Sequence, residues 1–102
     1  MVAAVERKTI VDLSGSLSNG TLIFELSKLA QVPRAAVVVE DRYSVMLKLT
    51  HAPGGFLPDL LARVQVRYPE ISIISLEARP LAEEWAYHWP GAAVFELEAG
   101  PA

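Results

Sequence analysis

One stretch of the sequence has the residue types and the glycine spacing of a phosphate-binding loop. Gly15 and Gly20 are spaced G-x-x-x-x-G, and an apolar segment that we expect to be a strand precedes them. The lysine that a P-loop uses to reach the phosphates is missing, because Thr21 follows directly. This argues against nucleotide hydrolysis, but backbone amides and hydroxyls here are suited to hold a carboxylate or a phosphate. The candidate ligand-binding residues are Gly15, Ser16, Ser18, Asn19, Gly20 and Thr21. The other interpretation is a small-residue turn that only caps a helix.

Both tryptophans of the chain lie in one short segment near the C-terminal end. Trp85 and Trp89 are four residues apart, so a helix places them on one face, with His88 beside them. These side chains either pack over the sheet as part of the core or form a contact with another protein, because Trp is enriched in binding hot spots. A third interpretation is an aromatic platform for a planar ligand. We name Trp85, His88 and Trp89 as candidate partner-contact residues.

The residue inventory offers little for metal or catalytic chemistry. The chain has no cysteine, and its two histidines are His51 and His88. A zinc site needs three or four ligands, so these imidazoles do not suffice by themselves. No G-x-S-x-G nucleophile elbow occurs, and no acid–base constellation stands out. We therefore expect no catalytic residues, no metal and no cofactor, and we lean towards a non-enzymatic protein.

The apolar patterning predicts four strands and two helices in the first three quarters of the chain. Strands are expected on 8–14, on 35–40 and on 43–49, the last two forming a hairpin through Asp41-Arg42, and a fourth on 71–77. A loop at 51–55 leads into a helix on 56–68. Two alternatives exist for the stretch before Pro33: a helix that begins at Asn19 or Gly20, or a hairpin that turns at Asn19-Gly20.

With the helix alternative, the order of elements is βαββαβ. This order predicts a ferredoxin-like α+β fold over residues 8–77, an antiparallel sheet with two helices on one face. Residues 78–98 would add a short helix on 81–89, closed by Pro90-Gly91, and an edge strand on 92–98. At 102 residues we expect a single domain, 1–102.

The βαββαβ pattern resembles the small ligand-sensing modules of bacteria, namely ACT domains, the effector modules of Lrp/AsnC-type regulators and the substrate-sensing tails of methionine importers. This resemblance is one of architecture. It implies an amino-acid ligand held against the loop between the first strand and the first helix, the position that Gly15–Thr21 would take here.

Charge and hydropathy bear on partners and location. The net charge is −3 and the pI is about 5.3, which gives no electrostatic drive towards nucleic acid. The N-terminal residues lack the apolar run of a signal peptide, and no apolar stretch approaches about 20 residues. We expect a cytoplasmic protein that binds neither nucleic acid nor a membrane.

Taken together, the sequence favours a small interaction or assembly module that self-associates, as a homodimer or a subunit of a protein complex. The contact would be the Trp85–Trp89 segment with an exposed face or edge of the sheet. The alternative is an ACT-like sensor of an amino acid or an anion, using the Gly15–Thr21 loop.

Overall fold

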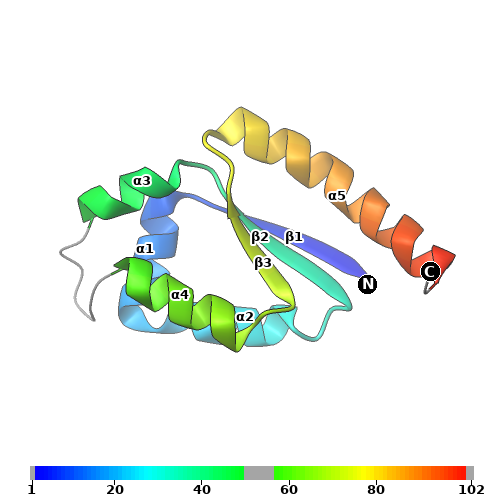
Figure 1. Cartoon of the computed structure of the whole chain (residues 1–102), viewed down its shortest axis with the longest axis horizontal. Helices are drawn as coiled ribbons and strands as arrows, with labels where there is room; N and C mark the ends of the chain where they lie inside the picture. The colour runs from blue at the N-terminus through cyan, green and yellow to red at the C-terminus, as the bar shows by residue number, and fades with distance from the viewer. Residues whose placement is uncertain (1, 50–56, 101–102) are drawn as a thin grey trace.

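Three strands form one all-parallel sheet, seen in the computed structural model, which describes residues 2–49 and 57–100. The strands are β1 (Ala3–Lys8), β2 (Arg34–Val39) and β3 (Ile71–Ser75), in the spatial order β1-β2-β3 (Figure 1). Within the described residues, β2 is the central strand, and β1 and β3 are the two edges.

Helices connect the strands and cover both faces of the sheet. Two helices lead from β1 to β2, and a short helix, a 3₁₀ turn and a longer helix lead from β2 to β3. Figure 1 shows α1, α2 and α4 on one side of the sheet and α5 by itself on the other. The elements are α1 (Ile10–Asn19), α2 (Thr21–Leu29), α3 (Tyr43–Met46), η1 (Leu47–Leu49), α4 (Leu57–Arg67) and α5 (Arg79–Ala99).

The central strand is buried on both faces. All residues from Ala35 to Val39 are buried, and such an unbroken apolar run is typical of a parallel strand covered by helices on both sides. Val37 and Val39 point into the core beneath α1, α2 and α4, while Ala36 and Val38 point towards α5.

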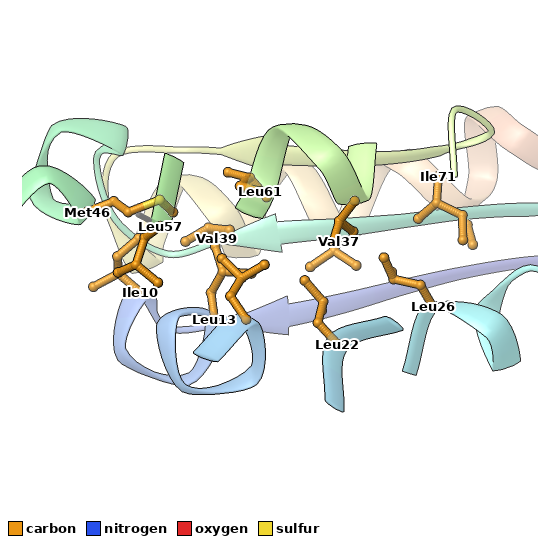
Figure 2. Close-up of a cluster of buried hydrophobic side chains, with 13 residues drawn as sticks. Ile10, Leu13, Leu22, Leu26, Val37, Val39, Met46, Leu57, Leu61 and Ile71 are labelled. Atoms are coloured by element: carbon orange, nitrogen blue, oxygen red, sulfur yellow. The ribbon is translucent and has the colours of Figure 1, made fainter. Parts of the chain in front are cut away.

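The main core lies between the sheet and the layer of α1, α2 and α4. Figure 2 shows side chains from these helices meeting those of β2 and β3. The cluster consists of Ile10, Leu13, Leu17, Leu22, Leu26, Ala35, Val37, Val39, Met46, Leu57, Leu61, Val64 and Ile71.

The first helix begins directly after β1. Thr9 is its N-cap, and the Thr9 hydroxyl accepts a hydrogen bond of 3.1 Å from the backbone N–H of Asp12. Ile10, Leu13 and Leu17 recur at helical spacing and are all buried. The helix ends at Gly20, whose φ of 80° is left-handed, and α2 starts with the next residue.

The expected ferredoxin-like fold with an antiparallel sheet is wrong. Residues 10–14 belong to α1 and not to a strand, and 43–49 form α3 and η1 in place of the second arm of a hairpin. Val45 and Met46 both pack against the core, and these adjacent positions lie on one side of a helical turn but on opposite faces of a strand. Without that strand, β2 takes parallel neighbours on both sides.

The expected break at Pro90-Gly91 and the strand on 92–98 are also wrong. α5 runs through Pro90 to Ala99 as one helix of 21 residues. Pro90 removes one hydrogen bond of the helix and its ring crowds the carbonyl of Ala86, at a cost of about 3 kcal/mol that the rest of the helix must offset. Ala, Glu and Leu dominate residues 92–98, and these residues favour helix strongly enough to continue it.

Other expectations are confirmed. The helix alternative holds for the stretch before Pro33, since α2 occupies 21–29, and α4 and β3 form where a helix and a strand are expected. The predicted loop at 51–55 and the predicted helix start at Phe56 lie outside the described residues.

Gly15 inside α1 and Gly20 at the α1–α2 junction provide a matched test of backbone strain. Apart from chain neighbours and the backbone of the same helix, no atom of the described residues lies within 4 Å of a Cβ built on either glycine, so their difference lies in backbone conformation. We expect Gly20→Ala to destabilise the fold by about 1–2 kcal/mol, because a side chain is strained at positive φ. Gly15→Ala lies in a helix interior and should stabilise the fold by about 0.5–1 kcal/mol. Urea unfolding measures both, and equal effects of the two substitutions would contradict this assignment.

Candidate interaction surface

The six predicted ligand-binding residues do not form a loop. Gly15, Ser16, Ser18 and Asn19 lie in α1, Gly20 joins the two helices, and Thr21 opens α2. Their backbone amides are therefore not gathered around one point as they are in a phosphate-binding loop. The assignment of a ligand to these residues remains a prediction.

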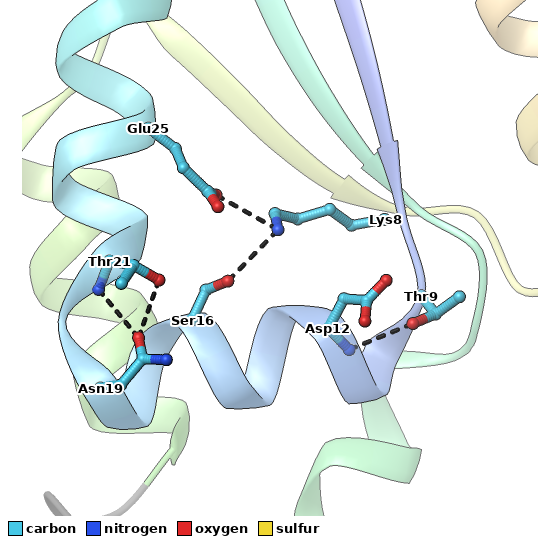
Figure 3. Close-up of polar contacts among 7 residues, drawn as sticks. All are labelled: Lys8, Thr9, Asp12, Ser16, Asn19, Thr21 and Glu25. Atoms are coloured by element: carbon cyan, nitrogen blue, oxygen red, sulfur yellow. Dashed lines mark hydrogen bonds and ion pairs between the residues drawn. The ribbon is translucent and has the colours of Figure 1, made fainter.

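Several of their polar groups are bound within the chain (Figure 3). The Asn19 Oδ1 atom accepts hydrogen bonds from the Thr21 backbone N–H at 3.0 Å and from the Thr21 hydroxyl at 2.7 Å. The Ser18 hydroxyl donates to the carbonyl of Ser14 at 2.8 Å. These hydrogen bonds occupy polar groups of the residues themselves and stabilise the junction of α1 and α2.

A shallow apolar hollow of about 170 Å³ lies between the α1–α2 junction and α4. Of the predicted ligand residues, Ser16 and Gly20 line it, while the other four do not. The rest of the lining is mostly aliphatic, with one cation from α4. The remaining lining residues are Leu17, Leu22, Ile23, Leu60, Arg63 and Val64.

A buried lysine is the feature that our reasoning from sequence missed. Lys8 ends β1, and its Nζ donates to the Ser16 hydroxyl at 3.3 Å and lies 3.2 Å from the Glu25 Oε2 atom (Figure 3). The Lys8–Glu25 contact is an ion pair without hydrogen-bond geometry. The buried Ser14 hydroxyl of α1 has no hydrogen-bond partner among the described residues. Alternation along β1 places Glu6 on the same face of the sheet as Lys8. Lys8 is the last residue of β1 and is paired in register with Val39 of the core, which is why its side chain points into the helical layer.

A second ionic cluster fastens α5 to the opposite face of the sheet. The Oε1 atom of Glu83 in α5 forms two ion pairs. It lies 3.0 Å from the Nη1 atom of Arg7 in β1 and 2.9 Å from the Nε atom of Arg79 in α5. Arg7 also lies 3.6 Å from Glu40, which follows β2. The hydrogen bond from Arg79, and then the one from Arg7, lowers the pKa of the Glu83 carboxyl below its ordinary value. The same hydrogen bond raises the pKa of Arg79.

The candidate contact residues Trp85, His88 and Trp89 all lie on α5. The two indole rings stack with centroids 5.7 Å apart and planes at 24°, and both are half-buried. The His88 ring is exposed and meets the ring of Tyr87 edge-on at 5.2 Å. Trp85 and His88 line an apolar hollow of about 330 Å³ together with Leu76, Leu81 and Glu84, whereas Trp89 does not line it.

The burial of α5 is low for a helix of its length and composition. Of its 21 residues only Ala82 is buried. Tyr87 is 82% exposed and Phe95 is 69% exposed, and both point away from the sheet. Apolar side chains therefore lie on both sides of the helix, a pattern typical of helices that are covered on both sides.

Metal chemistry finds no support in the part of the chain that the structure describes. Across 2–49 and 57–100, no three His, Cys, Asp or Glu side chains lie close enough together to hold a metal ion. His51, the second histidine of the sequence, lies outside those ranges. None of the helices in those ranges has the length and hydropathy to cross a bilayer.

Comparisons of the chain with known protein families, with curated proteins and with solved structures found no match.

The buried ion pair yields a prediction about stability. Glu25→Gln leaves the Lys8 ammonium buried without its carboxylate, so we expect a loss of about 1–3 kcal/mol in the free energy of unfolding. Lys8→Met combined with Glu25→Leu replaces both charges by apolar groups and should recover most of that loss. Urea unfolding of the single variants Lys8→Met and Glu25→Leu and of the double variant that combines them measures the coupling. Additive effects of the two substitutions would show that the pair does not act as a unit.

The Glu83 cluster yields a prediction about pH. Because the folded pKa lies below the unfolded one, ionised Glu83 stabilises the fold above the unfolded pKa, and this stability is lost as pH falls through the folded pKa. Glu83→Gln should therefore reduce the difference in stability between pH 7 and pH 3. Glu70→Gln, the same change at an exposed position outside α5, should leave the difference close to that of the wild type. Urea unfolding at both pH values compares the two, and indistinguishable profiles would contradict the role given to Glu83.

Proposed function

We propose that this chain is a non-enzymatic interaction module that self-associates, with the outer face of α5 as its contact surface. The outer face means the exposed side of α5 that carries Tyr87, His88 and Phe95. The observation that carries the proposal is a 21-residue helix with apolar residues on both sides, of which one residue is buried.

Aromatic composition supports a protein contact at this place. Both tryptophans of the chain and two further aromatic residues lie within 11 consecutive residues of α5. Tyr and Trp are enriched at protein interfaces because they bury a large rigid surface at a low cost in conformational entropy. Trp85 and Trp89 lie half-exposed beneath the outer face, so a partner that covers α5 would bury them further.

The way α5 is attached also supports the proposal. The helix contacts β1 and β2, and its ionic links are the Arg7–Glu83 pair and, within the helix, the Arg79–Glu83 pair. Exposed ion pairs contribute little to stability, because water and salt screen the two charges. A helix that a partner also covers on its other side would gain the apolar burial that the sheet alone does not provide.

The self-association test uses two exposed aromatic residues and a matched pair of exposed aliphatic ones. We expect the wild type to dimerise in a concentration-dependent way in light scattering and sedimentation. Tyr87→Ser with Phe95→Ser should yield a monomer that unfolds as cooperatively as the wild type. Val11→Ser with Val66→Ser removes side chains of similar exposure, 68% and 80%, from α1 and α4 and should leave dimerisation unchanged.

Intrinsic fluorescence gives a second readout, because both tryptophans lie in α5. Dilution of the wild type should shift the emission to longer wavelength as the indoles become more exposed. A wild type that is monomeric at every concentration, with emission independent of dilution, would overturn the proposed function.

A further inference from the structure

We infer that the two copies pair through antiparallel α5 helices that cross at Gly91. This inference rests on the proposed self-association and adds its geometry and its contacts.

The exposed residues of α5 are arranged symmetrically about Gly91. Tyr87 lies four residues before it and Phe95 four residues after it, while Glu84 lies seven before and Glu98 seven after. Spacings of four and seven place all of these residues on one face of a helix. Each of them is exposed, so this face is the one turned away from the sheet.

Symmetry of this kind is what a twofold contact needs. In a twofold interface, residue i of one copy meets residue j of the other, and j meets i. An antiparallel crossing at Gly91 places Tyr87 of each copy against Phe95 of the second copy, so one contact forms twice. Offset or edge-to-face packing of such a ring pair favours the contact beyond the burial of apolar area.

Glycine at the crossing point allows the helices to come close. Gly91 is exposed, and apart from its two neighbours and the backbone of its own helix no atom of residues 2–49 and 57–100 lies within 4 Å of a Cβ built on it. Two such surfaces can approach more closely than the usual 8–10 Å between helix axes, which brings the flanking rings into reach of each other. Figure 1 shows that α5 stands alone on its side of the sheet, so a second α5 meets no other element of the described chain there.

The size of the contact indicates a weak dimer. A helix of 21 residues is about 31 Å long, so a stripe about 10 Å wide along it covers roughly 310 Å² on each copy and roughly 620 Å² on the two together. That area lies below the range of about 1,200–2,000 Å² for specific, stable interfaces, as is usual for weak contacts. Glu84 would also lie near Glu98 of the second copy at each end of the contact, so like charges oppose association there. We therefore expect a dissociation constant in the micromolar range.

Cysteine cross-linking tests the arrangement directly, because the chain has no cysteine of its own. Under mild oxidation, an equimolar mixture of the Tyr87→Cys and Phe95→Cys variants should form the mixed disulfide about tenfold faster than either variant alone forms its own dimer. In the antiparallel pair, like positions lie about 12 Å apart along the axis. That separation exceeds the Cα–Cα range of about 4.4–6.8 Å for a disulfide. Gly91→Cys should link to itself.

Other cross-linking patterns would overturn the inference. Preferential self-linking of Tyr87→Cys and of Phe95→Cys would show a parallel pair. A dimer in which none of these variants links would show that α5 is not at its centre, while self-association as such would stand. A monomeric wild type would overturn the proposed function itself and this geometry with it.

A second pair of variants tests the close approach without cysteine chemistry. Gly91→Gln inserts a side chain at the crossing and should raise the dissociation constant of the dimer by a factor of about ten or more. Gly15→Gln makes the same change at an exposed glycine inside α1 and should leave dimerisation unchanged. Equal dissociation constants for the two variants would contradict the crossing at Gly91.

Discussion

The burial of β2 on both faces is the constraint on which the rest of the structure depends. A strand with five consecutive buried residues needs a helical layer on each face of the sheet, because its apolar side chains point alternately to the two faces. It also needs a neighbouring strand on each side, because its buried backbone groups require hydrogen-bond partners. Parallel neighbours require crossover connections, and the helices of these connections form the larger of the two layers. The second face is left to α5, which covers it with Ala82 and half-buried side chains.

The two faces of the sheet are held in different ways. On one face, aliphatic side chains from α1, α2 and α4 form a continuous cluster with β2 and β3. On the other face, α5 lies over Ala36 and Val38 of β2, and the Arg7–Glu83 ion pair links it to β1. This asymmetry leaves apolar surface on α5, and it is the reason that we place the contact with a partner there.

Polar side chains at the end of β1 organise the packing of the helices. Lys8 points into the helical layer and joins β1 to α1 through Ser16 and to α2 through Glu25, while its neighbour Arg7 points to the opposite face and joins β1 to α5. Two adjacent residues of one strand therefore fix helices on both sides of the sheet, since successive side chains of a strand point in opposite directions. Ser16, which the glycine spacing had suggested as a ligand contact, is one of these internal connections.

The sequence alone determined the elements with a strong, unbroken pattern. The apolar run at Val37–Val39 indicated an interior strand, Pro69 marked the end of α4, and α2, α4 and β3 form where their patterns predict them. The end of α2 at Leu29 comes earlier than the position before Pro33 at which the pattern ended the helix. The stretch from Ile10 to Asn19 was missed because three serines and a glycine lower its helix propensity, although Thr9 and Asp12 carried a capping signal. The clustering of Trp85, His88 and Trp89 on one helix was also visible from spacing.

Only the tertiary structure decided the direction of the strands, the helical state of 43–49 and 92–98, and the burial of Lys8. Short segments with alternating apolar residues fit a strand and a helical turn about equally well, so their state depends on whether a sheet edge or a helical layer is there to receive them. Strand direction depends on which connections can cross the sheet, a property of the whole chain. The exposure of the outer face of α5 is decided in the same way. Helical spacing places Tyr87 and Phe95 on one side of the helix, but the packing of α5 on β1 and β2 determines that this side faces away from the sheet.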